Sequence, residues 1–121
     1  MNPIRVLVCG SRNWTDEVAI RRAFDDLPPG STIIHGGARG ADSIAERLAI
    51  EMDFNMRAFH AQWDTLGKAA GPERNQRMID EGKPDLVIAF PLPDSRGTWD
   101  MVSRAKRAGV EVRVVRAGGA T

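Results

Sequence analysis

Five short apolar runs recur along this chain, and segments with helical spacing of apolar residues separate them. The runs occupy residues 4–9, 32–35, 56–60, 85–90 and 110–115. Runs of this kind, largely apolar and rich in β-branched residues, are typical of strands that are covered on both faces. Strands that alternate with helices predict an α/β fold, here a Rossmann-like three-layer sandwich with a mainly parallel five-stranded sheet.

Capping and turn residues place the helices between these runs. Helical spacing extends over residues 15–27, 41–52, 72–82 and 97–108. Thr15 is a favourable N-cap for the first segment, and Pro72 suits the first turn of the third. Gly82 is expected to end that third helix, and the glycine-rich residues 67–72 before it are expected to form a connection.

Length and charge narrow the class of protein. The 121 residues are expected to form one domain over residues 1–116, with a loose tail at 117–121. The 17 basic and 16 acidic side chains leave a net charge of +1, and no basic run stands out. Nucleic acid is therefore an unlikely partner.

Hydropathy and the cysteine content indicate a compartment. No stretch approaches the roughly 20 apolar residues that a membrane-spanning helix needs, so we expect no membrane association. Cys9 lies within an apolar run and is expected to be a small buried side chain. A single cysteine allows no intramolecular disulfide, which fits a cytoplasmic location.

The topology directs attention to one edge of the sheet. In open parallel sheets, ligands bind beyond the carboxyl ends of the strands, where the strand order reverses. Four polar, glycine-bearing stretches fall at that edge, namely residues 10–12, 35–42, 63–77 and 91–100.

The stretch 35–42 reads His-Gly-Gly-Ala-Arg-Gly-Ala-Asp and joins a strand to a helix. Glycines let the backbone approach a ligand, and the N–H groups of a first helical turn favour an anion such as phosphate. The candidate ligand-binding residues here are Gly36, Gly37, Arg39, Gly40 and Asp42. The glycines have an alternative role in packing the helix closely against the sheet. Asp42 either caps the helix or accepts a hydrogen bond from a ribose hydroxyl.

Two further stretches repeat this chemistry. Gly10, Ser11 and Arg12 offer a backbone N–H, a hydroxyl and a guanidinium, which suit phosphate or ribose, although an ordinary tight turn has the same composition. Gly97 and Thr98 stand at another helix start, where Thr98 either donates to a phosphate oxygen or caps the helix.

Other polar and aromatic residues at this edge complete the candidate set. Arg74 follows the glycine-rich stretch and is favoured as a ligand contact, with Asn75 beside it. Trp63 and Trp99 suit stacking on a base or burial equally well. Asp64 and Asp100 are further candidate carboxylates. His35 and His60 have no partner at metal-ligand spacing, so we expect neither a metal nor a cofactor.

Four linked motifs together resemble the SLOG superfamily, the Rossmann-like group that joins the LOG phosphoribohydrolases to the DprA/Smf proteins. The nearest resemblance is to the small YspA-type, YpsA-related SLOG family, and it covers nearly the whole chain. The motifs are Cys-Gly-Ser-Arg at 9–12, the stretch at 35–42, Gly-Pro-Glu-Arg-Asn-Gln-Arg-Met at 71–78 and Gly-Thr-Trp-Asp-Met at 97–101.

The resemblance implies a pocket for a nucleotide or a nucleotide-derived sugar. It implies that the glycine turns and the helix start at Gly97 and Thr98 hold a 5′ phosphate. It also implies that Arg74, four residues before Met78, contacts the ligand. LOG sites use residues from a partner subunit, so a homodimer or a higher homo-oligomer is expected.

The chain departs from the LOG pattern at the catalytic position. Met101 stands three residues after Thr98, where LOG enzymes have a catalytic Glu, and Asp94-Ser95-Arg96 replaces their Pro-Gly-Gly. Cleavage of an N-glycosidic bond passes through an oxocarbenium-like state that a carboxylate stabilises. The tentative catalytic residues are therefore Asp100 and Arg74, with Asp42 and Asp64 as weaker candidates for the carboxylate.

Three functions remain open at this point. The first is binding of a nucleotide or an NAD-derived metabolite such as an ADP-ribose-like molecule, by a protein that senses or sequesters it. The second is a nucleoside 5′-monophosphate phosphoribohydrolase. The third and weakest is handling of single-stranded DNA, as in DprA, which the absence of a basic stripe disfavours.

Overall fold

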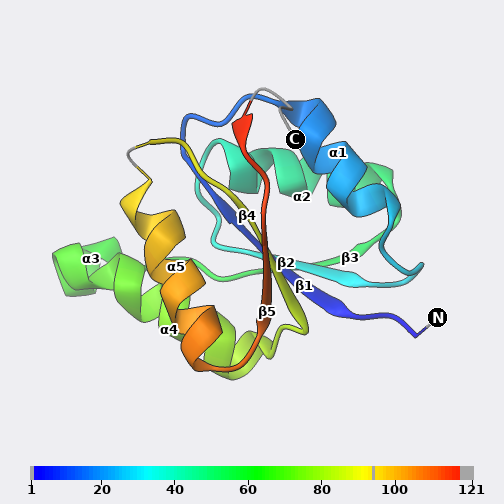
Figure 1. Ribbon diagram of the computed structural model, residues 1–121. Coiled ribbons are helices and arrows are strands. Elements are labelled where there is room, and N and C mark those ends of the chain that lie inside the picture. The colour runs from blue at the N-terminus through cyan, green and yellow to red at the C-terminus, as the bar shows by residue number, and fades with distance from the viewer. Residues whose placement is uncertain (1, 94, 118–121) are drawn as a thin grey trace.

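A computed structural model describes residues 2–93 and 95–117 and confirms the α/β sandwich (Figure 1). The sheet has the strand order β3-β2-β1-β4-β5, and all four pairings are parallel. The strands are β1 (Arg5–Gly10), β2 (Thr32–His35), β3 (Asn55–Ala58), β4 (Leu86–Phe90) and β5 (Glu111–Val114). Of the tail expected at 117–121, all but Ala117 lies outside the described residues.

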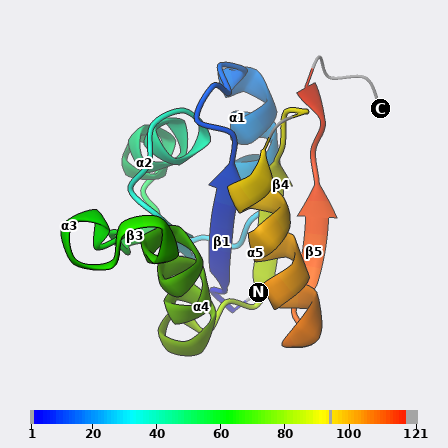
Figure 2. The same cartoon turned by 90° about the vertical axis from the view of Figure 1, so that its left-hand side faces the viewer.

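Helices cover both faces of the sheet, as Figures 1 and 2 show from two sides. The pair α1 (Glu17–Asp25) and α2 (Ala41–Glu51) packs on one face, and the pair α4 (Ala70–Gly82) and α5 (Arg96–Arg107) on the other. The chain builds β2 and β3 to one side of β1, then returns to build β4 and β5 on its other side. The strand order therefore reverses between β1 and β4, beside which a ligand site is expected.

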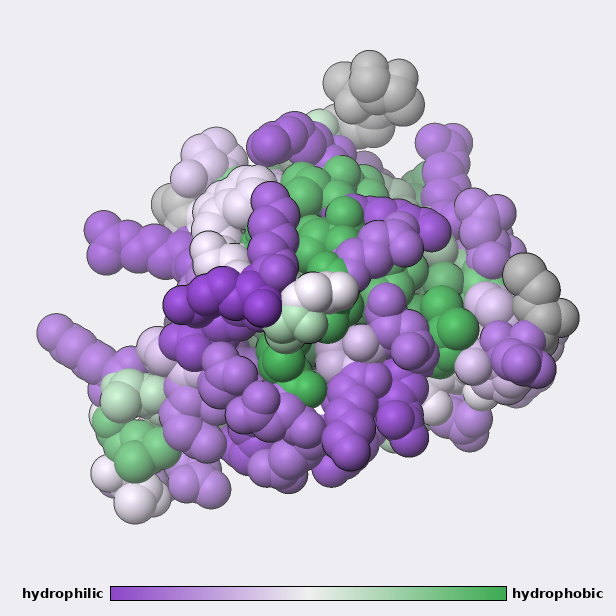
Figure 3. All heavy atoms as spheres, turned by 60° about the horizontal axis from the view of Figure 1, so that its bottom comes forward, coloured by the Kyte–Doolittle hydropathy of each residue, from purple (hydrophilic) through white to green (hydrophobic). Residues whose placement is uncertain are grey.

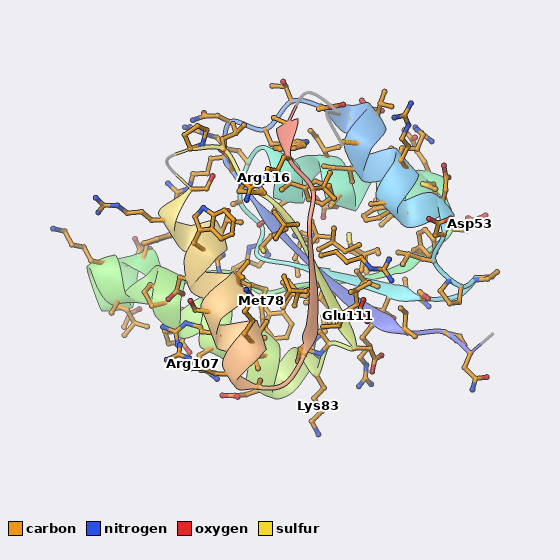
Figure 4. The ribbon with its side chains drawn as sticks, viewed as in Figure 1. Asp53, Met78, Lys83, Arg107, Glu111 and Arg116 are labelled. Carbon is orange, nitrogen blue, oxygen red and sulfur yellow. The ribbon has the colours of Figure 1, made fainter. Side chains whose placement is uncertain are left out.

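Two hydrophobic clusters hold these layers together, because successive residues of a strand point to opposite faces. On β1, Val6 and Val8 join the cluster under α1 and α2, whereas Leu7 and Cys9 join the one under α4 and α5. Cys9 is buried, as expected, and burial raises the pKa of its thiol far above the ordinary value. Met78 of α4 lies among the interior side chains beneath α5 (Figure 4).

The N-cap of α1 is Asp16 rather than Thr15. The Asp16 carboxylate accepts a hydrogen bond from the backbone N–H of Ala19 at 3.2 Å. The indole N–H of the buried Trp14 donates to the Asp16 carbonyl at 2.9 Å, which fixes the backbone at this residue. The packing of Trp14 thus shifts the start of the helix by one position.

The end of α4 also differs from the expectation. Gly82 remains helical, because its backbone packs against β2, where an added Cβ would lie 3.3 Å from Ile34. The left-handed terminating residue is Lys83, with φ of +48°, and its side chain points away from the protein (Figure 4). Gly82 therefore lies in a closely packed part of the helix and does not terminate it.

The glycine-rich segment before α4 is helical, not a simple connection. It contains the short helix α3 (Trp63–Leu66), the 3₁₀ turn η1 (Gly67–Ala69) and the first residues of α4. Gly67, with φ of +55°, separates α3 from the following turn. The α3 segment projects from the left of Figure 1, and its exposed side chains include Leu66.

The outer surface is predominantly polar. In Figure 3 hydrophilic side chains cover most of the face that is shown, while hydrophobic groups appear near its centre and over the projecting α3 segment. Among the described helices, none has both the length and the hydropathy that crossing a bilayer requires.

Candidate functional site

Two adjoining clefts lie at the carboxyl edge of the sheet. The inner cleft, of about 380 Å³, lies between the N-termini of α2 and α5. The outer cleft, of about 490 Å³, lies between the turn at 36–39 and the segment at 60–63. Both clefts are lined by Arg12, Ala38, Arg39 and Arg74, so they are continuous. Each volume falls within the range of small-molecule sites, roughly 300 to 1,000 Å³.

The clefts bring together most of the residues that the sequence nominates. Nine of them line the inner cleft, namely Gly10, Ser11, Arg12, Arg39, Asp42, Arg74, Asn75, Gly97 and Thr98. Gly36, Gly37 and Trp63 line the outer cleft. Gly40, Asp64 and Asp100 line neither of the two. Asp64 borders a separate shallow hollow on the α3 segment.

Positive charge dominates the inner cleft. Its lining includes four guanidinium groups and one carboxylate, which leaves a net charge of +3 when that carboxylate is ionised. Three of the cations, Arg12, Arg39 and Arg74, are the ones shared with the outer cleft. The fourth, Arg96, lies in the stretch 91–100 but was not among the sequence candidates. Guanidinium groups bind phosphate and carboxylate oxygens in pairs, so this lining favours an anion.

Among the residues that the structure describes, Asp42 supplies the only carboxylate of this lining, and its two oxygens differ. Its Oδ2 accepts hydrogen bonds from the backbone N–H groups of Gly36 and Ala38, each at 3.2 Å. Its Oδ1 is buried and has no hydrogen-bond partner among the described residues. Burial raises the pKa of Asp42 to about 6, against the lowering effect of those N–H groups and of nearby Arg74.

His35 completes the internal bonding of the same turn. Its Nδ1 accepts a hydrogen bond from the backbone N–H of Gly37 at 3.0 Å. Burial lowers the pKa of His35, so the ring is neutral, and its Nε2 lies 3.8 Å from Glu46. Three successive N–H groups, at 36, 37 and 38, are therefore bonded to the protein's own side chains. In this state the turn that resembles a phosphate loop already holds a carboxylate.

Gly40 and Gly10 bring α2 against β1. Gly40 has φ of +73°, and an added Cβ would collide with the backbone carbonyls of Ser11 and Arg12. A Cβ on Gly10 would lie 2.5 Å from the Cβ of Ala41, whose backbone N–H donates to the Ser11 carbonyl. Close packing, the alternative role for such glycines, accounts for these two without a ligand.

Arg74 reaches from α4 across to the turn. Its Nη1 donates to the Gly36 carbonyl at 2.6 Å, and its Nε donates to Asn75 Oδ1 at 3.2 Å. A Cβ on Gly36 would lie 2.5 Å from that Nη1, so glycine is needed for the guanidinium to reach this place. Burial lowers the pKa of Arg74, but a guanidinium remains charged at any physiological pH. Arg74 thus fixes a positive charge between the two clefts.

Asp100 lies behind Asn75 and outside the lining of both clefts. Its Oδ2 accepts hydrogen bonds from Asn75 Nδ2 and from Arg104 Nε, both at 2.9 Å. Partial burial acts to raise its pKa, but these two hydrogen bonds outweigh it, so the pKa of Asp100 is below the ordinary value. Asn75 also donates to the Gly97 carbonyl at 3.2 Å, so this network ties α4 to the start of α5.

The N-terminus of α5 opens onto the inner cleft. The hydroxyl of its N-cap residue, Ser95, accepts the N–H of Leu92 at 2.8 Å and makes no capping bond to the helix. An added Cβ on Gly97 would meet no atom within 4 Å, so the space above this residue is open. Thr98 follows it in the lining. This helix start, unlike the turn at 36–38, is arranged to receive a ligand atom.

Trp63 forms a wall of the outer cleft, and 48% of its surface is exposed. The Arg12 guanidinium carbon lies 5.8 Å from the centroid of its ring. Trp99 lines neither cleft and instead lies beneath Arg116, whose guanidinium carbon is 5.6 Å from that ring. His60 lines the outer cleft, although the sequence named it only as a strand end at this edge.

Comparisons with known proteins agree with this fold. Residues 4–65 match the profile of the "YspA, cpYpsA-related SLOG family". The chain is 42% identical over 117 residues to the Gene 61 protein of Mycobacterium phage D29, which covers 89% of this chain and 93% of that protein. It also superposes on DNA processing protein A (DprA) from Streptococcus pneumoniae with a TM-score of 0.76 at 20% identity, over 93% of this chain and 50% of DprA. The chain therefore spans about half the length of that protein, and the likeness shows the fold alone.

Proposed function

We propose that this chain, which belongs to the YspA, cpYpsA-related SLOG family, binds the sugar phosphate of a nucleotide or nucleotide-derived metabolite in the inner cleft. One observation carries the proposal: four arginines and Asp42 line the same cleft, and the buried Oδ1 of Asp42 has no hydrogen-bond partner among the described residues. The cations suit the phosphate, and the buried acceptor oxygen suits a sugar hydroxyl, which donates. The phosphate takes the open N-terminus of α5, and the hydroxyl lies toward Asp42.

Binding without cleavage is the function that this lining favours. The LOG glutamate is replaced by Met101, and Asp100 is engaged by Asn75 and Arg104 outside the cleft. An acid with a lowered pKa is also a poor proton donor at neutral pH. The protein then acts by sensing or sequestering its ligand, of which an ADP-ribose-like molecule is one example.

A phosphoribohydrolase is the second candidate, and Asp42 is the observation that favours it. Asp42 lines the cleft and its Oδ1 has no hydrogen-bond partner among the described residues, so this carboxylate is able to stabilise positive charge on a sugar ring beside it. In this version Asp42, and not Asp100, is the catalytic carboxylate. DNA handling as in DprA is the weakest candidate, because the net charge is only +1.

Calorimetry with ribose 5-phosphate, AMP and inorganic phosphate tests the proposal. The decisive variant is Arg96→Ala, which removes an exposed cation from the inner cleft. Its matched control is Arg107→Ala, at the far end of the same helix (Figure 4). We expect Arg96→Ala to weaken ribose 5-phosphate binding roughly tenfold, the loss of one charge-assisted hydrogen bond.

The outcomes separate the three candidates. No binding of ribose 5-phosphate or AMP, or equal losses in both arginine variants, contradicts the proposed cleft. Chromatography of the AMP mixture distinguishes the hydrolase, because free adenine appears only if the glycosidic bond is cut. Turnover that disappears in Asp42→Asn assigns that chemistry to Asp42, and salt-sensitive binding of single-stranded DNA supports the third candidate.

Self-association is a separate proposal, supported by the small size of the chain and by the family resemblance. We propose a homodimer or a higher homo-oligomer. Sedimentation at micromolar concentration measures the mass, and a monomer there contradicts it.

A further inference from the structure

We infer that the outer cleft is a subsite for a planar heteroaromatic base, with Trp63 as the surface on which the base stacks. The inference rests on the proposed function, because the base is carried on the sugar phosphate that the inner cleft binds. It adds a second contact region and a residue that determines specificity.

Two side chains lie close against the glycine turn that borders the outer cleft. A Cβ on Gly36 would lie 2.5 Å from Arg74 Nη1, and a Cβ on Gly37 would lie 2.5 Å from His60 Nδ1. Gly37 also has φ of +70°, which a residue with a side chain rarely adopts. The two glycines therefore allow Arg74 and His60 to lie directly against the turn, and both of these side chains line the outer cleft.

The walls of the cleft carry the groups that recognise a base. Trp63 is 48% exposed, although aromatic side chains of this size are usually more buried. A ring of that kind is a stacking platform for any base, because every base has a π-face. Arg12 and Arg39 supply hydrogen-bond donors and no acceptors, so they suit the oxygen and nitrogen acceptors of a base edge.

The connection between the clefts gives the ligand its orientation. Three arginines, Arg12, Arg39 and Arg74, line both clefts. A ligand whose sugar phosphate lies in the inner cleft is therefore able to extend its base into the outer cleft alongside these three cations. The Arg12 guanidinium carbon is 5.8 Å from the Trp63 ring centroid, which places the cation at this junction. The base therefore lies over Trp63 and the phosphate at the start of α5. Purines bind more tightly than pyrimidines, because they offer a larger stacking area.

The test measures how much the base adds to binding. Calorimetry gives the dissociation constants of ribose 5-phosphate, AMP and UMP, and their ratios isolate the base. In the native chain we expect AMP to bind roughly tenfold more tightly than ribose 5-phosphate, as base stacking implies, with UMP between the two. In Trp63→Ala this ratio falls to about one, while ribose 5-phosphate binds as before. Trp63→Phe restores most of the ratio.

The matched control is Trp99→Ala, which removes another partly exposed tryptophan that lines neither cleft. We expect it to leave the ratio unchanged. Equal binding of AMP and ribose 5-phosphate in the native chain, or a ratio retained in Trp63→Ala, overturns the subsite while leaving the inner cleft intact. Failure of ribose 5-phosphate itself to bind overturns the proposed function and the subsite together. Because Trp63 is exposed, loss of folding in the alanine variant is not expected, and circular dichroism checks this.

Discussion

The turn at 36–40 and the helix start at 96–98 have similar sequences and opposite surroundings. In the first, Gly36, Gly37 and Gly40 face protein atoms, and the N–H groups at 36–38 are bonded to Asp42 and His35. In the second, the space above Gly97 is open. A glycine-bearing strand-to-helix turn is thus able to serve either as internal packing or as an anion site. The turn serves as internal packing when buried side chains of the same protein already bond to its backbone N–H groups, and as an anion site when they do not.

The largest expected effect is a loss of stability when the first turn is disrupted. Gly40→Ala places a Cβ against the Ser11 and Arg12 carbonyls at a residue with φ of +73°. Left-handed strain and overpacking together cost on the order of 4 kcal/mol of the free energy of unfolding. Urea denaturation monitored by circular dichroism measures it. A loss below about 1 kcal/mol would show that α2 does not depend on this contact.

The variant Asp42→Asn, which removes the negative charge, tests whether the buried carboxylate lowers the free energy of unfolding while it binds the N–H groups of the turn. Folded Asp42 keeps its proton up to about pH 6, whereas its ordinary pKa is 3.8, so the folded state binds more protons between these values. Stability from this group is therefore lost as pH rises from about 4 to 6, by roughly 3 kcal/mol at most. Asn keeps an oxygen for the two N–H groups and removes this loss.

The readout for Asp42→Asn is the difference in unfolding free energy between variant and native chain across pH 4 to 8. The difference is expected to grow in favour of the variant up to about pH 6 and then to level off. The contribution of His35, which runs in the opposite direction because its pKa is lowered, is present in both chains and cancels. A difference that does not change with pH contradicts the assigned pKa.

The smallest expected effect on stability is at the second turn. Gly97→Ala adds a Cβ to open space at an early position of α5 and stabilises the helix by about 0.5 to 1 kcal/mol. The same methyl group stands where a phosphate is proposed, so ribose 5-phosphate is expected to bind at least several-fold more weakly. Thermal unfolding and calorimetry on one preparation give both values. Unchanged affinity would move the phosphate away from α5.

The layer order, and the gathering of the glycine-bearing stretches beside the inner cleft, could be predicted from the sequence because they follow from local patterns. Apolar runs fix the strands, and the reversal of strand order beside β1 brings the glycine-bearing stretches together. The hydrogen bonds that Asp42 accepts from the N–H groups of Gly36 and Ala38 could not be predicted, because they depend on the backbone path of the turn. The ion pair between Asp100 and Arg104 could be predicted from the sequence, since Arg104 stands four residues later on the same helix face.

The helix ends show the same division between local and distant causes. Gly82 was expected to terminate α4, but it lies inside the helix, where an added Cβ would make a tight contact with Ile34, far away in the sequence. The α3 segment was missed because it is only four residues long and none of them is buried against the sheet. Patterns along the chain therefore identify elements that pack on the sheet better than those that project from it.

If the proposed anionic ligand binds in the inner cleft, the buried Asp42 carboxylate makes that binding a proton-coupled event. Its pKa of about 6 already lies close to neutrality, and a phosphate that enters the same cleft raises it further through like-charge repulsion. Binding at pH 7 then takes up a fraction of a proton from the buffer. Affinity for an anionic ligand accordingly increases as pH falls toward 6, and the heat of binding depends on the ionisation enthalpy of the buffer. In the proposed function, Asp42 would therefore couple ligand binding to the acidity of the surroundings through one side chain.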